Sequence, residues 1–172
     1  VPRPVSRDAA RDANKVGGEV MLTITALEHF YGESHTLWDL DLDVAAGARA
    51  CLMGRNGVGK TTLLKCIMGL ERPAAGEIRF EGVDLVDRRA EDRARLGIAY
   101  VPQGREIFPR LTVEENLRIG LGVTGARAIP DAIFELFPVL GEMLARRGGD
   151  LSGADARSVM RGQCCTRMAS TT

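Results

Sequence analysis

The fold of this chain is decided by Gly54-Arg55-Asn56-Gly57-Val58-Gly59-Lys60-Thr61-Thr62. This stretch satisfies the pattern G-x-x-x-x-G-K-[ST], a glycine-rich loop (P-loop) that cradles phosphate groups. Glycines permit positive φ and a close approach of backbone to phosphate, and successive N–H groups in such a loop form an anion-binding nest. The pattern predicts a nucleoside triphosphate site whose phosphates contact Gly54, Asn56, Gly57, Gly59, Lys60, Thr61 and Thr62.

The two polar side chains at the end of the loop have separate predicted tasks. Lys60 is expected to reach the β- and γ-phosphates, and the Thr61 hydroxyl to ligate Mg²⁺. The helix that starts here directs the positive end of its dipole toward the phosphates. The alternative is a glycine-rich turn that only joins a strand to a helix.

The segments on either side of the loop fit the setting that a phosphate loop requires. Residues 49–53 form a short apolar run, which predicts a buried strand leading into the loop. Residues 60–70 carry apolar side chains at helical spacing, so we expect an amphipathic helix after it. A strand, the glycine loop and a helix in this order favour the functional interpretation over a plain turn.

Further strands and helices are predicted from periodicity and turn residues. Alternation of Asp with Leu or Val predicts a half-buried strand over 40–44. Thr112 and Glu115 have the spacing of a capping box, which predicts the start of a helix. The other expected strands cover 21–27, 77–80 and 98–101, and the other expected helices cover 87–96, 130–137 and 139–146.

The composition is that of a globular domain and excludes several classes of function. The chain has 172 residues, 45% of them hydrophobic and 27% charged, with a formal net charge of zero. This charge balance does not indicate binding to nucleic acid. No apolar run approaches the roughly 20 residues of a membrane-spanning helix, and the polar N-terminus does not resemble a secretion signal. Cys51 and Cys66 are expected to be core residues, and His29 and His35 receive no role.

Residues 21–153 resemble the N-terminal two-thirds of an ATP-binding-cassette (ABC) transporter ATPase. Three features besides the loop carry the resemblance, in the family's order: Tyr31 in His-Phe-Tyr-Gly, Gln103 in Tyr-Val-Pro-Gln, and the partial signature Leu151, Ser152 and Gly153. The resemblance implies an α/β P-loop NTPase of ABC ATPase type, with an N-terminal antiparallel β-subdomain, a partial P-loop core sheet and a helical subdomain. It also implies that Tyr31 stacks on adenine, that Gln103 is the Q-loop residue that ligates Mg²⁺ together with Thr61, and that ATP is the nucleotide.

The run from Gln103 to Leu117 resembles the branched-chain amino acid type of importer ATPase, and within it the urea importer subunit. Residues 133–140 and 146–153 support the same subgroup. This resemblance implies membrane permease subunits and a second ATP-binding subunit as partners, and a location on the cytoplasmic face of the cell membrane. No residue here is expected to contact the transported substrate, because the resemblance implies that a binding protein and the permease select it. The assignment to urea therefore rests on resemblance and not on site chemistry.

The sequence departs from the family after Gly153, where Ala154 and Asp155 replace the Gly-Gln of the signature. We therefore expect 21–153 to be a partial ATP-binding domain and 154–172 an irregular tail outside the family. Residues 1–20 contain few large apolar residues and show no clear period, so we expect a disordered tail there. The C-terminal part of the core, with the Walker B Asp and the catalytic Glu, is expected to be missing, and no catalytic residue is evident. The alternative to an importer ATPase is thus a nucleotide-binding fragment that does not hydrolyse ATP, or a nonfunctional truncated product. An ABC ATPase of DNA repair or translation is disfavoured by the importer-like run.

Overall fold

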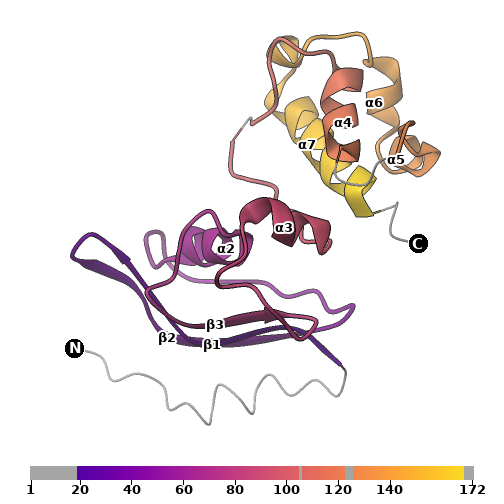
Figure 1. Cartoon of the computed structure of the whole chain (residues 1–172). Coiled ribbons are helices and arrows are strands. Elements are labelled where there is room, and N and C mark those ends of the chain that lie inside the picture. Colours follow the sequence, from indigo (N-terminus) through magenta and orange to yellow (C-terminus); the bar gives the residue numbers. More distant parts are fainter. Residues whose placement is uncertain (1–18, 105, 123–125, 169–172) are drawn as a thin grey trace. The chain divides into compact units, whose positions relative to one another are not determined.

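The computed structural model describes residues 19–104, 106–122 and 126–168 (Figure 1). The chain divides into two compact units, residues 1–93 and 94–172, and each is described by itself. The expected disordered tail falls almost entirely outside the described residues, except that Val20 already belongs to the first strand. Within the described ranges, no helix has the length and apolar character needed to cross a membrane.

The first unit is built on an antiparallel sheet with the order β2-β1-β3-β4. Its strands are β1 (Val20–Tyr31), β2 (Ser34–Ala45), β3 (Ala75–Phe80) and β4 (Val83–Asp84). The central strand β1 pairs with β2 on one edge and with β3 on the other. The strands predicted over 21–27, 40–44 and 77–80 are therefore confirmed, and so is the antiparallel β-subdomain.

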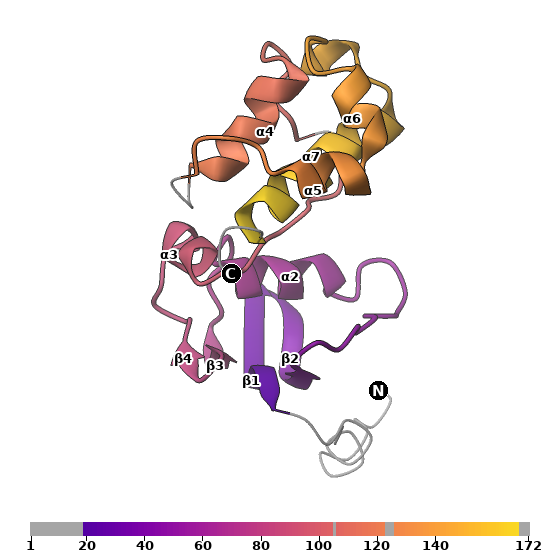
Figure 2. The same ribbon diagram turned by 90° about the vertical axis from the view of Figure 1, so that its right-hand side faces the viewer.

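Helix α2 (Lys60–Met68) follows the glycine loop and lies on one side of this sheet (Figures 1 and 2). Its side chains Leu63, Cys66 and Met68 are buried, as are Ile24 and Leu27 of the sheet. The helix ends at Gly69, whose φ of 73° provides the left-handed conformation typical of a C-terminal cap. The predicted amphipathic helix is confirmed, although Leu64 and Leu70 are exposed.

Two predicted core strands are absent from the described part of the chain. Residues 49–53 and 98–101 have no strand conformation, and Met53 is 85% exposed. A strand needs a neighbour that supplies its ladder of hydrogen bonds, and no described segment pairs with either run. The expected P-loop core sheet is therefore not formed here, and only the antiparallel sheet is present among the described residues.

The prediction that Cys51 lies in the core is wrong for the same reason. Cys51 is exposed because it belongs to the unpaired run 49–53, whereas Cys66 is fully buried on α2. Burial is the main cause that raises the pKa of the Cys66 thiol to about 11, and the nearby Glu71 charge adds to it.

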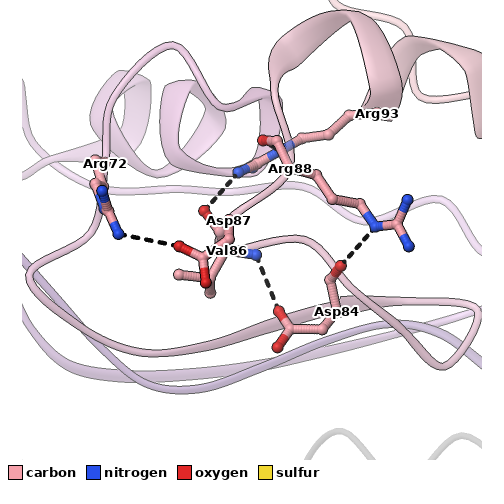
Figure 3. Close-up of polar contacts among 6 residues, drawn as sticks. All are labelled: Arg72, Asp84, Val86, Asp87, Arg88 and Arg93. Atoms are coloured by element: carbon pink, nitrogen blue, oxygen red, sulfur yellow. Dashed lines mark hydrogen bonds and ion pairs between the residues drawn. The ribbon is translucent and has the colours of Figure 1, made fainter.

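A buried arginine closes the C-terminal end of α2. The Arg93 side chain is 1% exposed, and its Nη1 donates to the carbonyls of Cys66 (2.6 Å) and Ile67 (2.9 Å). Its Nε donates to the Arg88 carbonyl at 2.9 Å and its Nη2 to the Val86 carbonyl at 3.3 Å (Figure 3). The guanidinium thus donates to the last carbonyls of α2, in addition to the Gly69 N–H that donates to the Cys66 carbonyl at 3.1 Å. Burial lowers the Arg93 pKa.

The loop that receives Arg93 is held by polar contacts of its own. The backbone N–H of Val86 donates to Asp84 Oδ1 at 2.9 Å, and Arg88 Nε donates to the Asp84 carbonyl at 3.0 Å (Figure 3). Arg72 pairs with Asp87 at 3.0 Å on the surface. These contacts fix the backbone of 84–88 in the position where its carbonyls accept from Arg93.

The second unit is a cluster of helices. It contains α4 (Val113–Leu121), α5 (Asp131–Leu136), α6 (Pro138–Glu142), the 3₁₀ turn η1 (Gly148–Asp150) and α7 (Gly153–Met168), while the short α3 (Ala90–Arg95) spans the boundary between the units (Figure 2). The capping box of α4 is confirmed: Thr112 Oγ1 accepts from the Glu115 N–H, and the Glu115 carboxylate accepts from the Thr112 N–H. The hydrogen bonds that the Thr112 N–H and hydroxyl donate to this carboxylate lower the pKa of Glu115.

The prediction of an irregular tail is wrong for residues 154–168, because Gly153–Met168 form the helix α7; residues 169–172 lie outside the described residues. Ala156, Val159 and Met160 follow helical spacing and are buried against α4 and α6 residues such as Leu117 and Leu140. The helical pattern is weak in the sequence because residues such as Ala156 and Gly162 are small. The packing requires a small residue at position 162, since a Cβ at Gly162 would lie 2.7 Å from Leu117 Cδ2.

Replacing Arg93 with Met is expected to destabilise the first unit by about 3 kcal/mol, because buried carbonyls lose their donors. Urea unfolding followed by circular dichroism measures this change. Arg89→Met is the matched control: Arg89 is 73% exposed and forms only surface ion pairs, so its change is expected within about 0.5 kcal/mol. Equal effects of the two variants would contradict the capping role.

Replacing Val159 with Asp is expected to unfold α7 from its neighbours and to cost about 3 kcal/mol or more, because an unpaired charge enters the core. The readouts are the urea midpoint and the helical circular dichroism signal. Arg157→Asp changes an exposed position of the same helix and should leave the midpoint nearly unchanged. A midpoint for Val159→Asp equal to that of the wild type would restore the irregular-tail interpretation.

Candidate functional site

The glycine loop has the backbone conformation that its sequence predicts. Gly54, Gly57 and Gly59 have φ values of 156°, 84° and 94°, which side-chain-bearing residues rarely adopt. At Gly59 there is also no room, because a Cβ would lie 2.7 Å from Leu37 Cδ2 and 3.0 Å from the Thr36 carbonyl. Strand β2 therefore packs directly against the point where the loop enters α2.

Lys60 extends back over the loop. Its Nζ donates to the carbonyl oxygens of Gly54 at 2.8 Å and of Arg55 at 2.7 Å. These two hydrogen bonds hold the ammonium group along the loop, at the N-terminal end of α2 where the helix dipole also favours an anion.

The amides at the start of α2 are available to a ligand. Of its first four N–H groups, only that of Leu63 has a backbone acceptor within the described part of the chain, the Gly59 carbonyl at 2.9 Å. The Thr61 side chain is exposed, whereas Thr62 is only 7% exposed. Amides, an ammonium and a hydroxyl, with no acidic residue between 54 and 62, form a donor set that fits a polyphosphate with its Mg²⁺.

Tyr31 lies at the end of β1, next to the hairpin turn. The residue is 45% exposed, and its ring meets the His29 ring edge-on, with centroids 4.6 Å apart. Its hydroxyl donates to Glu71 Oε1 at 3.2 Å. The exposed aromatic surface is available for stacking on a planar base, which is the role predicted for it.

Glu71 is a residue of this region that the sequence did not reveal. Its Oε1 lies 3.8 Å from Lys65 Nζ, and its Oε2 lies 3.8 Å from His29 Nε2. Glu71 thus joins β1 to the end of α2 across a separation of 40 residues in sequence. A single carboxylate that lies within no motif carries no signal for such a contact; only the fold brings these side chains together.

The remaining predicted site residues belong to the second unit. Gln103 is exposed in an irregular stretch, and Leu151 is buried in the helical core. Ser152 caps α7: its Oγ accepts from the Asp155 N–H at 3.2 Å and donates to Asp155 Oδ2 at 2.7 Å. The Asp155 carboxylate therefore lies at the N-terminal end of α7, the helix that follows the partial signature.

No group of three or more His, Cys, Asp or Glu side chains suited to a metal ion occurs in the described ranges. A metal ion at the loop would therefore depend on the phosphates of a nucleotide together with the Thr61 hydroxyl. This is the usual situation for Mg²⁺ in nucleotide sites, where the ion keeps several waters and takes few protein ligands.

Two ATP-binding proteins of amino acid transport align with most of this chain. The chain is 38% identical over 146 residues to the high-affinity branched-chain amino acid transport ATP-binding protein BraG of Pseudomonas aeruginosa, covering 83% of this chain and 63% of BraG. It is 35% identical over 152 residues to the probable branched-chain amino acid transport ATP-binding protein LivF of Archaeoglobus fulgidus, covering 87% of this chain and 64% of LivF. The chain thus spans slightly less than two-thirds of the length of these relatives.

Solved structures of ABC ATPases share the fold. A structure described as the ATP-binding subunit of an ABC transporter aligns with a TM-score of 0.75 and 29% identity, over 86% of this chain and 62% of that one. A nucleotide-free ATP-binding cassette aligns with a TM-score of 0.74 over 87% of this chain and 66% of that one; at 23% identity it supports the fold alone. The α/β P-loop NTPase fold of ABC ATPase type is thereby confirmed.

The family model described as ABC transporter matches residues 37–167. The match includes the glycine loop, Gln103 and the signature region, and it continues through most of α7, beyond the point where the sequence resemblance was expected to end. By this match, the chain belongs to the ABC transporter family and carries sequence of its ATP-binding domain.

Proposed function

We propose that this chain is the ATP-binding part of an importer ATPase subunit that energises uptake of urea or branched-chain amino acids. The observation that carries the proposal is the Lys60 ammonium held over a positive-φ glycine loop at the start of α2. The names of BraG and LivF favour branched-chain amino acids as the substrate class. Urea rests on the resemblance of residues 103–117 alone.

In this proposal, different residues would contact different parts of the nucleotide. The amides of the loop and of the first turn of α2 would bind the phosphates, and Lys60 would exchange its carbonyl partners for β- and γ-phosphate oxygens. Thr61 would hold Mg²⁺, which neutralises phosphate charge when it is bound. A Mg²⁺ role for Gln103 rests on the family resemblance alone. The exposed ring of Tyr31 would stack on adenine.

The proposed subunit works with partners. Membrane permease subunits would select the transported substrate, and a second ATP-binding subunit, identical or different, would complete the nucleotide site from the opposite side. These partners place the protein on the cytoplasmic face of the cell membrane. Residues 103–117, which begin with the exposed Gln103, are the segment that we expect to face the permease.

The second candidate is a nucleotide-binding protein that does not hydrolyse ATP, and the contact between Ser152 and Asp155 favours it. In the importer proposal, the signature of one subunit faces the phosphates of the other. Here the Ser152 hydroxyl is already engaged by the Asp155 carboxylate at 2.7 Å. A negative charge at this helix end opposes the approach of a phosphate.

Replacing Lys60 with Ala is expected to weaken ATP binding by about 10- to 100-fold, because a charged hydrogen-bond donor to the phosphates is lost. Binding is measured with a fluorescent ATP analogue on the full chain. Lys60→Arg should fail to restore affinity, since the planar guanidinium cannot replace a compact ammonium. Arg79→Ala, on the exposed side of β3, is the control. Unchanged affinity in Lys60→Ala would contradict the site.

Release of inorganic phosphate separates the two candidates. Turnover that disappears in Lys60→Ala supports the importer ATPase, whereas ATP binding without turnover supports the non-hydrolysing protein. A malachite-green assay on the purified chain measures this release.

Replacing Thr61 with Ala is expected to remove the increase in ATP affinity that Mg²⁺ provides, while affinity for metal-free ATP stays within about twofold. Titrations with Mg²⁺ and with EDTA make the comparison. Thr61→Ser keeps the hydroxyl and should behave as the wild type. A Mg²⁺ effect of unchanged size in Thr61→Ala would exclude this hydroxyl as a ligand.

A further inference from the structure

We propose that Glu71 is a positioning residue for the nucleotide base, acting through Tyr31. The inference rests on the proposed function, because it assumes that the Tyr31 ring stacks on adenine. The inference gives α2 a second role. Its first turn would bind the phosphates, and Glu71, which follows its C-terminal cap, would position the Tyr31 ring that stacks on the base.

The hydrogen bond from Tyr31 to Glu71 orients the ring. The phenol hydroxyl donates to Glu71 Oε1 at 3.2 Å, and the acceptor is a carboxylate, which makes a stronger partner than a neutral oxygen. Tyr31 lies beside the hairpin turn and is 45% exposed. This bond therefore opposes rotation of the side chain about its χ angles.

Glu71 itself is anchored to α2. Its backbone N–H donates to the Lys65 carbonyl at 3.3 Å, and the N–H of Leu70 donates to the same carbonyl at 2.9 Å. The Lys65 ammonium lies 3.8 Å from Oε1, the oxygen that accepts from Tyr31. Both the backbone and the side chain of the helix end therefore fix the carboxylate.

His29 completes the arrangement from the side of the sheet. Its side chain is 3% exposed, its Nε2 lies 3.8 Å from Glu71 Oε2, and its ring meets Tyr31 at an interplanar angle of 69°. Tyr31 is thus restrained at its hydroxyl by Glu71 and at its ring by His29. The restraint lowers the conformational entropy that the ring loses on stacking, which raises affinity for the base without any contact between Glu71 and the nucleotide.

The test compares ATP with inorganic tripolyphosphate, a probe that has the phosphates but no base. Isothermal titration calorimetry on the full chain is carried out with wild type, Glu71→Ala, Tyr31→Phe and the double variant. Each single variant is expected to bind ATP about fivefold more weakly, with tripolyphosphate affinity unchanged. Because both changes remove the same hydrogen bond, the double variant should bind ATP as the single variants do.

Glu77→Ala is the matched control. The Glu77 carboxylate on β3 is exposed and lies 3.1 Å from Arg79 Nε, so this variant should bind both probes as the wild type does. Tyr31→Phe removes one exposed hydroxyl, so the inference stays testable even if Glu71→Ala does not fold. Equal losses for ATP and tripolyphosphate, no loss for ATP, or additive losses in the double variant would overturn it.

The outcomes also separate this inference from the proposed function. A wild-type chain that binds neither probe would overturn both. A wild-type chain that binds both probes, with ATP affinity unaffected in Glu71→Ala and Tyr31→Phe, would overturn only the role of Glu71.

Discussion

The pair of hydrogen bonds from Lys60 to the Gly54 and Arg55 carbonyls closes the glycine loop onto the first turn of α2. The loop reaches this shape because glycine occupies its positive-φ positions. Strand β2 approaches so closely at Gly59 that no side chain would fit there. The position of the proposed phosphate site is therefore set by backbone conformation and by sheet packing together.

Helix α2 links the features that bear on function in the first unit. Its first turn presents amides and Lys60, its buried face packs toward the sheet, and its last turn is capped by Gly69 and by the buried Arg93. The residue Glu71 beyond this cap reaches back to Tyr31 on β1. A change at either end of the helix should therefore affect the nucleotide site, through the phosphates at one end and through the base at the other.

The features that were predicted correctly from the sequence are those that depend on local patterns of residues. The glycine loop, the strands of the hairpin, the capping box at Thr112 and the helix after the loop were all encoded by residue type and spacing over a few positions. The strands over 49–53 and 98–101 were predicted wrongly because an apolar run predicts a buried strand only where a neighbouring strand pairs with it. Helix α7 was missed because Ala156 and Gly162 make close packing without a conspicuous apolar stripe, and Glu71 because its contacts depend on tertiary structure.

The central claim is that the amides around Lys60 bind the phosphates of a nucleotide. The most direct measurement is a ¹H–¹⁵N correlation spectrum of the full chain during titration with Mg²⁺ and ATP. The largest amide shifts are expected at Gly57, Gly59, Lys60 and Thr61, and tripolyphosphate should produce the same shifts at these positions. Saturable ATP binding that leaves these amides unshifted would contradict the claim.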